Sequence, residues 1–129
     1  MSTKPVFDFL LVALGGAVGT MLRYGIARGI DGLTKNTFPV GTLVANVLGC
    51  LLIGILIGSG QDMKSESLRL WMGVGFLGGL TTFSTFAADT INEVNQNHWA
   101  LAIGNVASNL FVCLFVVVVG IALSKRFLA

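Results

Sequence analysis

The 129-residue sequence has little charge, only two cysteines and only two prolines. Charged residues make up 11% of the chain, whereas a soluble domain carries about 25%, and this deficit excludes a water-soluble globule. Two cysteines are too few for a disulfide scaffold, and eight scattered basic residues form no patch for nucleic acid. A hydrophobic share of 54% and a net charge of +2 exclude a disordered chain. A small integral membrane protein remains.

The charge-free residues are gathered in runs that predict membrane spans. A membrane helix needs about 20 mostly apolar residues. Counting histidine as neutral, three runs can each hold one span: 36–61, 70–88 and 94–124. The shorter run 9–22 crosses a membrane only if a first span includes Arg23. We therefore expect an all-α protein whose residues 1–129 form one transmembrane domain with spans near 6–28, 40–59, 68–91 and 99–124.

Small residues recur four positions apart in these spans. Such pairs let helix backbones approach closely in lipid. They fit packing within one subunit, and together they also suggest self-association, most commonly as a two-fold dimer. The pairs are Gly15 with Gly19, Ala45 with Gly49, Gly54 with Gly58, and Gly75 with Gly79. Loop lysines and arginines favour cytoplasmic termini by a small margin, which fits insertion in both orientations as well as an ordinary protein with short loops.

The third span contains adjacent glycines followed by a run of serine and threonine, over residues 75–86. Glycine weakens a helix, and Ser and Thr side chains compete for its backbone hydrogen bonds. This pattern predicts a break near mid-membrane that frees the carbonyls of Gly78 and Thr81. A cation held by such oxygens removes the cost of leaving them unpaired. The alternative is a glycine-rich kink in which hydroxyls bond the carbonyl four residues earlier.

Aromatic and amide side chains lie next to this segment in the predicted spans. Phe83 and Phe86 share a helix face, and their positive ring edges suit an anion, although packing or lipid contact also explains them. Asn46 brings an amide donor into the second span. Interhelical hydrogen bonding explains such polar residues equally well. A further polar stripe with the spacing i, i+4, i+8 occupies the fourth span: Asn105, Asn109 and Cys113.

Acidic residues are missing from the middle of every predicted span. Asp8 and Asp89 lie near span ends, which argues against proton-coupled exchange and against an acidic cation pore. Arg23 either snorkels to the interface or gives positive potential at the mouth of an anion path. No nucleophile–base pair or metal-ligand cluster is visible, so we do not expect an enzyme.

Over essentially its whole length the chain resembles the small bacterial fluoride channels called Fluc or CrcB, and three motifs carry the resemblance. They are residues 15–19 leading to Arg23, residues 41–46, and above all residues 75–86. The resemblance implies an antiparallel, dual-topology homodimer of four-helix subunits in the bacterial inner membrane. Each dimer would have two pores for passive fluoride export and a central structural sodium ion, which is not transported.

The resemblance also assigns roles to individual residues. The sodium ligands would be the backbone carbonyls of Gly78 and Thr81. The fluoride pathway would include Asn46, Phe83, Phe86, Ser84, Thr85, Asn105, Asn109 and Cys113. Supporting positions near the pathway or its vestibule would be Arg23, Thr42 and Asp89.

The fourth span departs from the family pattern. Hydroxyl residues are expected at the second and third positions of its polar track, where this chain has Asn109 and Cys113. Two other functions stay open as alternatives. A four-helix drug/proton antiporter would need a carboxylate deep in the first span, between Asp8 and Arg23, where none exists. A non-transporting membrane scaffold would use the same polar residues only for packing.

Overall fold

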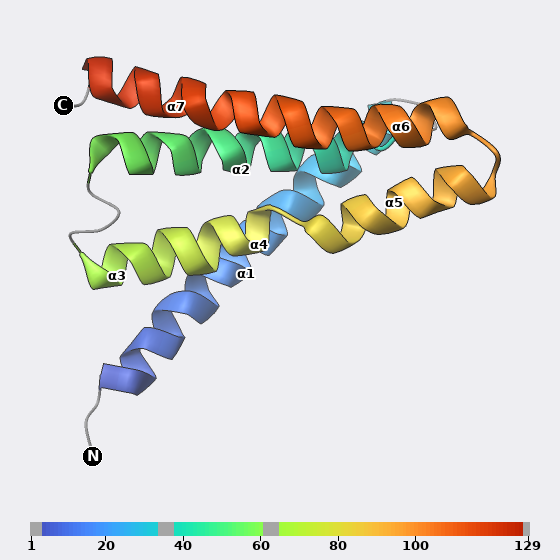
Figure 1. Cartoon of the computed structure of the whole chain (residues 1–129). Helices are drawn as coiled ribbons and strands as arrows, with labels where there is room; N and C mark the ends of the chain where they lie inside the picture. The colour runs from blue at the N-terminus through green and yellow to red at the C-terminus, as the bar shows by residue number, and fades with distance from the viewer. Residues whose placement is uncertain (1–3, 34–37, 61–64, 128–129) are drawn as a thin grey trace.

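The computed structural model describes residues 4–33, 38–60 and 65–127, and these fold entirely into helices and their connections (Figure 1). Four helical segments are long and apolar enough to cross a membrane: Lys4–Ile30, Val40–Ser59, Glu66–Asn95 and Trp99–Phe127. The prediction of an all-helical protein with four membrane spans is thereby confirmed. The first and third helical segments extend beyond the predicted limits of 6–28 and 68–91, because the helical backbone continues through the charged residues at their ends.

The first two spans are single helices, α1 (Lys4–Leu33) and α2 (Val40–Ser59). The other two are composite. The third contains α3 (Glu66–Leu68), the π-helical segment η1 (Arg69–Leu77), α4 (Gly78–Leu80) and α5 (Phe83–Asn95). The fourth contains α6 (Trp99–Ala107), the π-helical segment η2 (Ser108–Val112) and α7 (Cys113–Phe127). Widened π-helical turns are uncommon and occur often at functional sites, and here they lie in the third and fourth spans.

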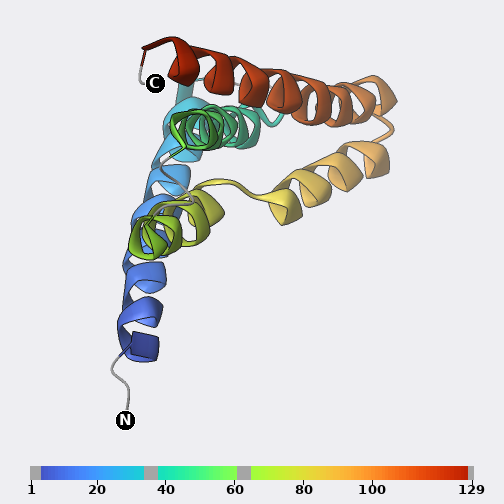
Figure 2. The ribbon, with the colours of Figure 1, turned by 60° about the vertical axis from the view of Figure 1, so that its left-hand side comes forward.

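Two residues of the third span leave helical geometry. Thr81 has φ −87° and ψ 154°, and Thr82 has φ −150° and ψ 119°, so both are extended. The Thr82 side chain accepts a hydrogen bond from the Thr85 backbone N–H and caps the start of α5. Threonine favours both roles, because its branched side chain suits extended backbone and its hydroxyl satisfies a free N–H at a helix start. The chain crosses between α4 and α5 in this extended form in Figures 1 and 2.

The second and fourth spans run parallel and lie side by side along most of their length (Figure 1). Glycines make this approach possible. A Cβ atom added to Gly54 would overlap the Val117 carbonyl oxygen, and one added to Gly120 would lie 2.6 Å from the Leu51 carbonyl oxygen. Gly54 and Gly58 therefore serve packing within the subunit, which was one of the two predicted roles beside self-association.

Helix α1 crosses the third span obliquely and packs on η1 and α4 (Figures 1 and 2). Added Cβ atoms at Gly15 and Gly19 would overlap the carbonyl oxygens of Trp71 and Phe76, respectively. The third span packs equally closely on α1, because a Cβ atom added to Gly79 would lie 2.6 Å from the Gly16 carbonyl oxygen. Backbone-to-backbone packing thus fixes α1 against the segment that precedes the extended residues.

Few large side chains are buried in the subunit. The buried apolar residues are Ala45, Leu77, Leu80 and Ala102, whereas the other described leucine, valine and phenylalanine residues are exposed or half-buried. This distribution suits a chain whose surroundings are lipid or another subunit, since lipid tails are as apolar as leucine.

Substitution Gly19→Ala is expected to lower the free energy of unfolding by about 1–3 kcal/mol, because the new methyl group overlaps the Phe76 backbone and forces α1 away. Unfolding by SDS in mixed micelles, followed by tryptophan fluorescence, measures this loss. The matched control on the same helix is Gly25→Ala, where an added Cβ meets nothing within 4 Å. Equal loss of stability in the two variants would contradict the packing argument.

Candidate ion-conducting site

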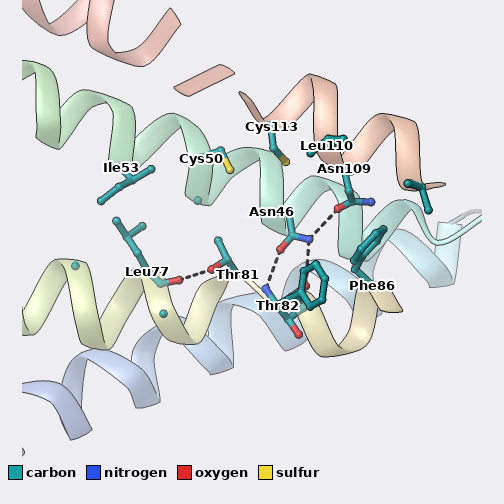
Figure 3. A pocket seen from close by; sticks show the side chains of 15 residues that line it. Asn46, Cys50, Ile53, Leu77, Thr81, Thr82, Phe86, Asn109, Leu110 and Cys113 are labelled. Atoms are coloured by element: carbon teal, nitrogen blue, oxygen red, sulfur yellow. Dashed lines mark hydrogen bonds between the residues drawn. The ribbon is translucent and has the colours of Figure 1, made fainter. Parts of the chain in front are cut away.

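The extended backbone of Thr82 is held by one side chain from the second span. Asn46 Oδ1 accepts from the Thr82 backbone N–H at 2.8 Å, and Asn46 Nδ2 donates to the Thr82 carbonyl at 3.2 Å. Figure 3 shows both bonds beside the pocket. A backbone N–H can only donate, so this pairing fixes which way the amide points. The Asn46 side chain replaces the hydrogen bonds that the extended residue cannot make within a helix.

Two carbonyl groups at and shortly before the extended residues have no hydrogen-bond donor in the described part of the chain. Within the described residues, neither a backbone N–H nor a side chain donates to the carbonyls of Gly78 and Thr81. The neighbouring carbonyl of Gly79 accepts from Arg23 Nε at 3.0 Å. Leu77 still accepts from both the backbone N–H and the hydroxyl of Thr81, at 3.0 and 2.9 Å. The segment therefore combines features of both sequence-based alternatives. The carbonyls of Gly78 and Thr81 have no described donor, and the Thr81 hydroxyl bonds the carbonyl four residues earlier.

Amide groups continue from Asn46 into the fourth span as a chain of hydrogen bonds. Asn46 Nδ2 donates to Asn109 Oδ1 at 2.9 Å, and Asn109 Nδ2 donates to Asn105 Oδ1 at 2.9 Å. Asn105 Nδ2 donates to the Thr90 hydroxyl at 2.9 Å, and that hydroxyl donates to the Phe86 carbonyl at 2.8 Å. Every donor in this series of hydrogen bonds has a partner, which meets the requirement that buried polar groups be hydrogen-bonded.

The two phenylalanines next to Thr82 form an aromatic pair. Their ring centroids are 5.3 Å apart and their planes are tilted by 58°. The Phe83 side chain is 80% exposed in the single subunit, whereas Phe86 is half-buried and lines the pocket. Tilted rings present edges as well as faces, and ring edges carry partial positive charge.

A cavity of about 710 Å³ lies where these groups meet, between α2, the third span and the fourth span (Figure 3). Its lining includes seven of the predicted site residues: Asn46, Gly78, Thr81, Phe83, Phe86, Asn109 and Cys113. None of the described residues that line it is charged. Asn105 is fully buried behind this lining and contacts it through Asn109 and the Phe86 carbonyl.

The remaining predicted residues lie around the cavity. Ser84 and Thr85 both hydrogen-bond the Thr82 hydroxyl, at 3.3 and 3.0 Å. The Thr42 hydroxyl donates to Asp89 Oδ2 at 2.8 Å. Arg23 does not snorkel along α1, because its side chain bonds the backbone of α4 instead. These residues support the site from its edges.

Three residues of this arrangement have no role in the sequence-based prediction. Thr82 and Thr90 connect the backbone to the amide chain, and Cys50 lines the cavity opposite Cys113. Thr82 could have been found from the capping preference of threonine before Phe83. Thr90 and Cys50 could not, because their partners lie on other helices.

Four helical segments long and apolar enough to cross a membrane, three of which line an uncharged cavity, define a multi-pass membrane protein. The family model described as CrcB-like protein, Camphor Resistance (CrcB), matches residues 10–121, so the chain belongs to this family. Relatives named fluoride-specific ion channel FluC include those of Shewanella sp. (strain W3-18-1), 45% identical, and Shewanella loihica, 40% identical. Each match covers 88% of this chain and 92% of the relative. The expectation of a channel family rather than an enzyme family is confirmed.

Substitution Asn46→Ala should leave the N–H and carbonyl of Thr82 without partners, at about 1–3 kcal/mol for each group. We expect roughly 10- to 100-fold faster amide exchange in the peptide that contains Thr82. Hydrogen–deuterium exchange read by mass spectrometry gives the rate. In the control Asn109→Ala, both bonds from Asn46 to Thr82 remain, so exchange should stay close to that of the unmodified protein. Identical exchange in both variants would show that Asn46 does not hold this segment.

Proposed function

We propose that this protein is a fluoride-specific channel that conducts fluoride passively out of the cytoplasm. The observation that carries the proposal is the meeting of a continuous amide chain with two phenylalanine rings at an uncharged cavity within the membrane. The relatives named as fluoride-specific channels support the choice of fluoride among anions.

The pathway that we propose follows the groups around the cavity. Fluoride would shed water, contact the ring edges of Phe83 and Phe86, and then pass to the donors Asn46 and Asn109. The hydroxyls of Ser84 and Thr85, the buried amide of Asn105 and the thiol of Cys113 would border this route. Each amide donor already has an acceptor in the chain of hydrogen bonds. An arriving fluoride would therefore replace one acceptor by another, which keeps every N–H paired.

We propose a break near mid-membrane in the third span, supported by the extended residues Thr81 and Thr82. The carbonyls of Gly78 and Thr81 fit a hard monovalent cation, because carbonyl oxygens are hard ligands and these two have no described donor. Gly78 is exposed, and an added Cβ there would meet nothing within 4 Å. When bound by both subunits, a structural sodium ion would supply fixed positive charge that lowers the cost of dehydrating fluoride.

The subunit is proposed to function as an antiparallel, dual-topology homodimer in the bacterial inner membrane, with two pores at the interface. Exposure of Phe83 and Gly78 supports this, since both belong to the proposed ion sites and would otherwise face lipid. The small difference in basic residues between the two sides supports insertion in both orientations. Arg23, Thr42 and Asp89 would support the route from positions near its ends.

Substitution of Phe83 or Phe86 by Ile should reduce fluoride efflux by about 100-fold, because loss of a ring edge that stabilises dehydrated fluoride raises the barrier by roughly 3 kcal/mol. A fluoride electrode measures efflux from proteoliposomes. The control Phe9→Ile removes a ring that is equally exposed but lies on α1, far along the chain from the cavity. Unchanged efflux in both pathway variants would contradict the route, and no fluoride flux from the unmodified protein would favour the scaffold alternative.

Removal of sodium during purification and reconstitution should lower fluoride efflux by about tenfold, as loss of a charge interaction of about 1.4 kcal/mol predicts. It should also lower the SDS concentration needed for unfolding, because ligands that bind only the folded state stabilise it. Restoring sodium, but not potassium at equal ionic strength, should reverse both effects. Equal behaviour in the two salts would exclude a specific sodium site.

A further inference from the structure

The parallel helices α2 and α7 keep one register over several turns. Asn46 and Asn109 are 63 positions apart and join by a hydrogen bond of 2.9 Å. Gly58 and Ile121 have the same separation, and a Cβ atom added to Gly58 would lie 2.7 Å from the Ile121 carbonyl oxygen. Residues four positions apart lie one above the other on a helix face. With each further helical turn, another residue of α2 therefore faces the residue 63 positions later in the fourth span.

The two cysteines of the chain occupy such a facing position. Cys50 and Cys113 have this same separation, one turn beyond the Asn46–Asn109 contact. Both are half-buried free thiols, and both line the cavity. In Figure 3 the two thiols extend from neighbouring helices on the side that faces the pocket.

The surroundings of the thiols select the kind of ion that they could hold. The nearby labelled side chains Ile53, Leu77 and Leu110 are apolar (Figure 3), and the described residues that line the cavity include no His, Asp or Glu. Zinc takes four ligands of the nitrogen, sulfur or carboxylate type, which this site does not offer. Two facing sulfurs in an apolar wall instead match a soft d¹⁰ cation with linear two-coordinate geometry, because thiolates select soft ions.

We propose that Cys50 and Cys113 together bind one soft monovalent d¹⁰ cation, of the Ag⁺ or Cu⁺ class, between α2 and α7. On binding, the S–H bond of one cysteine breaks and its proton leaves to water, while metal–sulfur bonds form to both sulfurs. No electrons are transferred. One positive charge enters and one leaves, so the site stays neutral, as a low-dielectric position within the membrane requires.

The site borders the amide chain. Cys113 follows Asn109 by one helical turn, and both line the same cavity. A bound cation would fix α2 to α7 at this level and would occupy space beside the proposed anion route. Reduced fluoride flux is thus a second expected effect, and only this effect rests on the proposed function.

Ag⁺ binding to the purified full-length protein tests the site directly in chloride-free buffer. We expect one Ag⁺ retained per subunit after desalting, measured by mass spectrometry of the metal. Substitutions C50S and C113S should each weaken binding by about tenfold or more, since a lone thiol loses the second bond. The double variant keeps all four methionines, so it corrects for binding to their thioethers. Equal retention by the double variant, or full affinity in either single variant, would overturn the proposal.

Two further measurements check the state of the thiols and the type of ion. Thiol titration of the reduced protein should find two free thiols per chain without Ag⁺ and none after one equivalent is added. A tenfold excess of Zn²⁺ should not displace Ag⁺. Displacement by Zn²⁺, or two thiols still reactive after Ag⁺ is added, would exclude a linear two-sulfur site.

Fluoride efflux from proteoliposomes gives the functional result. One equivalent of Ag⁺ should lower efflux by about tenfold in the unmodified protein and leave the C50S/C113S variant unaffected. Ag⁺ retention by a protein that conducts no fluoride would refute the proposed function while supporting the metal site. Fluoride conduction without Ag⁺ retention would refute the metal site alone.

Discussion

The pairing of the Asn46 side chain with the main chain of Thr82 is the interaction on which the site depends. An extended residue in a membrane helix leaves backbone groups that lipid cannot satisfy. Asn46 satisfies one donor and one acceptor of Thr82 with a single amide, and its remaining N–H begins the amide chain through Asn109. The residue that permits the irregular backbone is therefore also the first member of the polar network.

Glycine contacts give this interaction its rigid frame. Asn46 can reach Thr82 only because α2 is fixed against α7 and the third span is fixed against α1. Both contacts are made by backbone atoms at positions such as Gly54 and Gly19, where an added Cβ would overlap a neighbouring carbonyl oxygen. Close helix packing through small residues replaces the large buried core that a soluble domain of this size would need.

The sequence was informative wherever the signal was local. Charge-free runs predicted four helices, and the glycine, serine and threonine residues of 75–86 pointed to the segment where Thr81 and Thr82 are extended. The sequence did not predict which residues of different helices contact one another after packing. The bond from Arg23 to Gly79 and the facing of Cys50 and Cys113 depend on helix register, which no single helix encodes. Roles in ion conduction lie further still, since the proposed pores and cation site involve a second subunit and bound ions.

The parallel direction of the second and fourth spans has an electrostatic consequence. The peptide dipoles of a helix place about half a positive elementary charge at its N-terminal end. α2 and α6 begin on the same side, with Val40 and Trp99 as their first residues, and α1 and α5 end on that side, with Leu33 and Asn95 as their last. Each positive helix start therefore has a helix end of about equal and opposite partial charge beside it. The helix dipoles largely cancel at this face, so the potential that an ion meets as it arrives from water is set by side chains and by individual unpaired backbone groups.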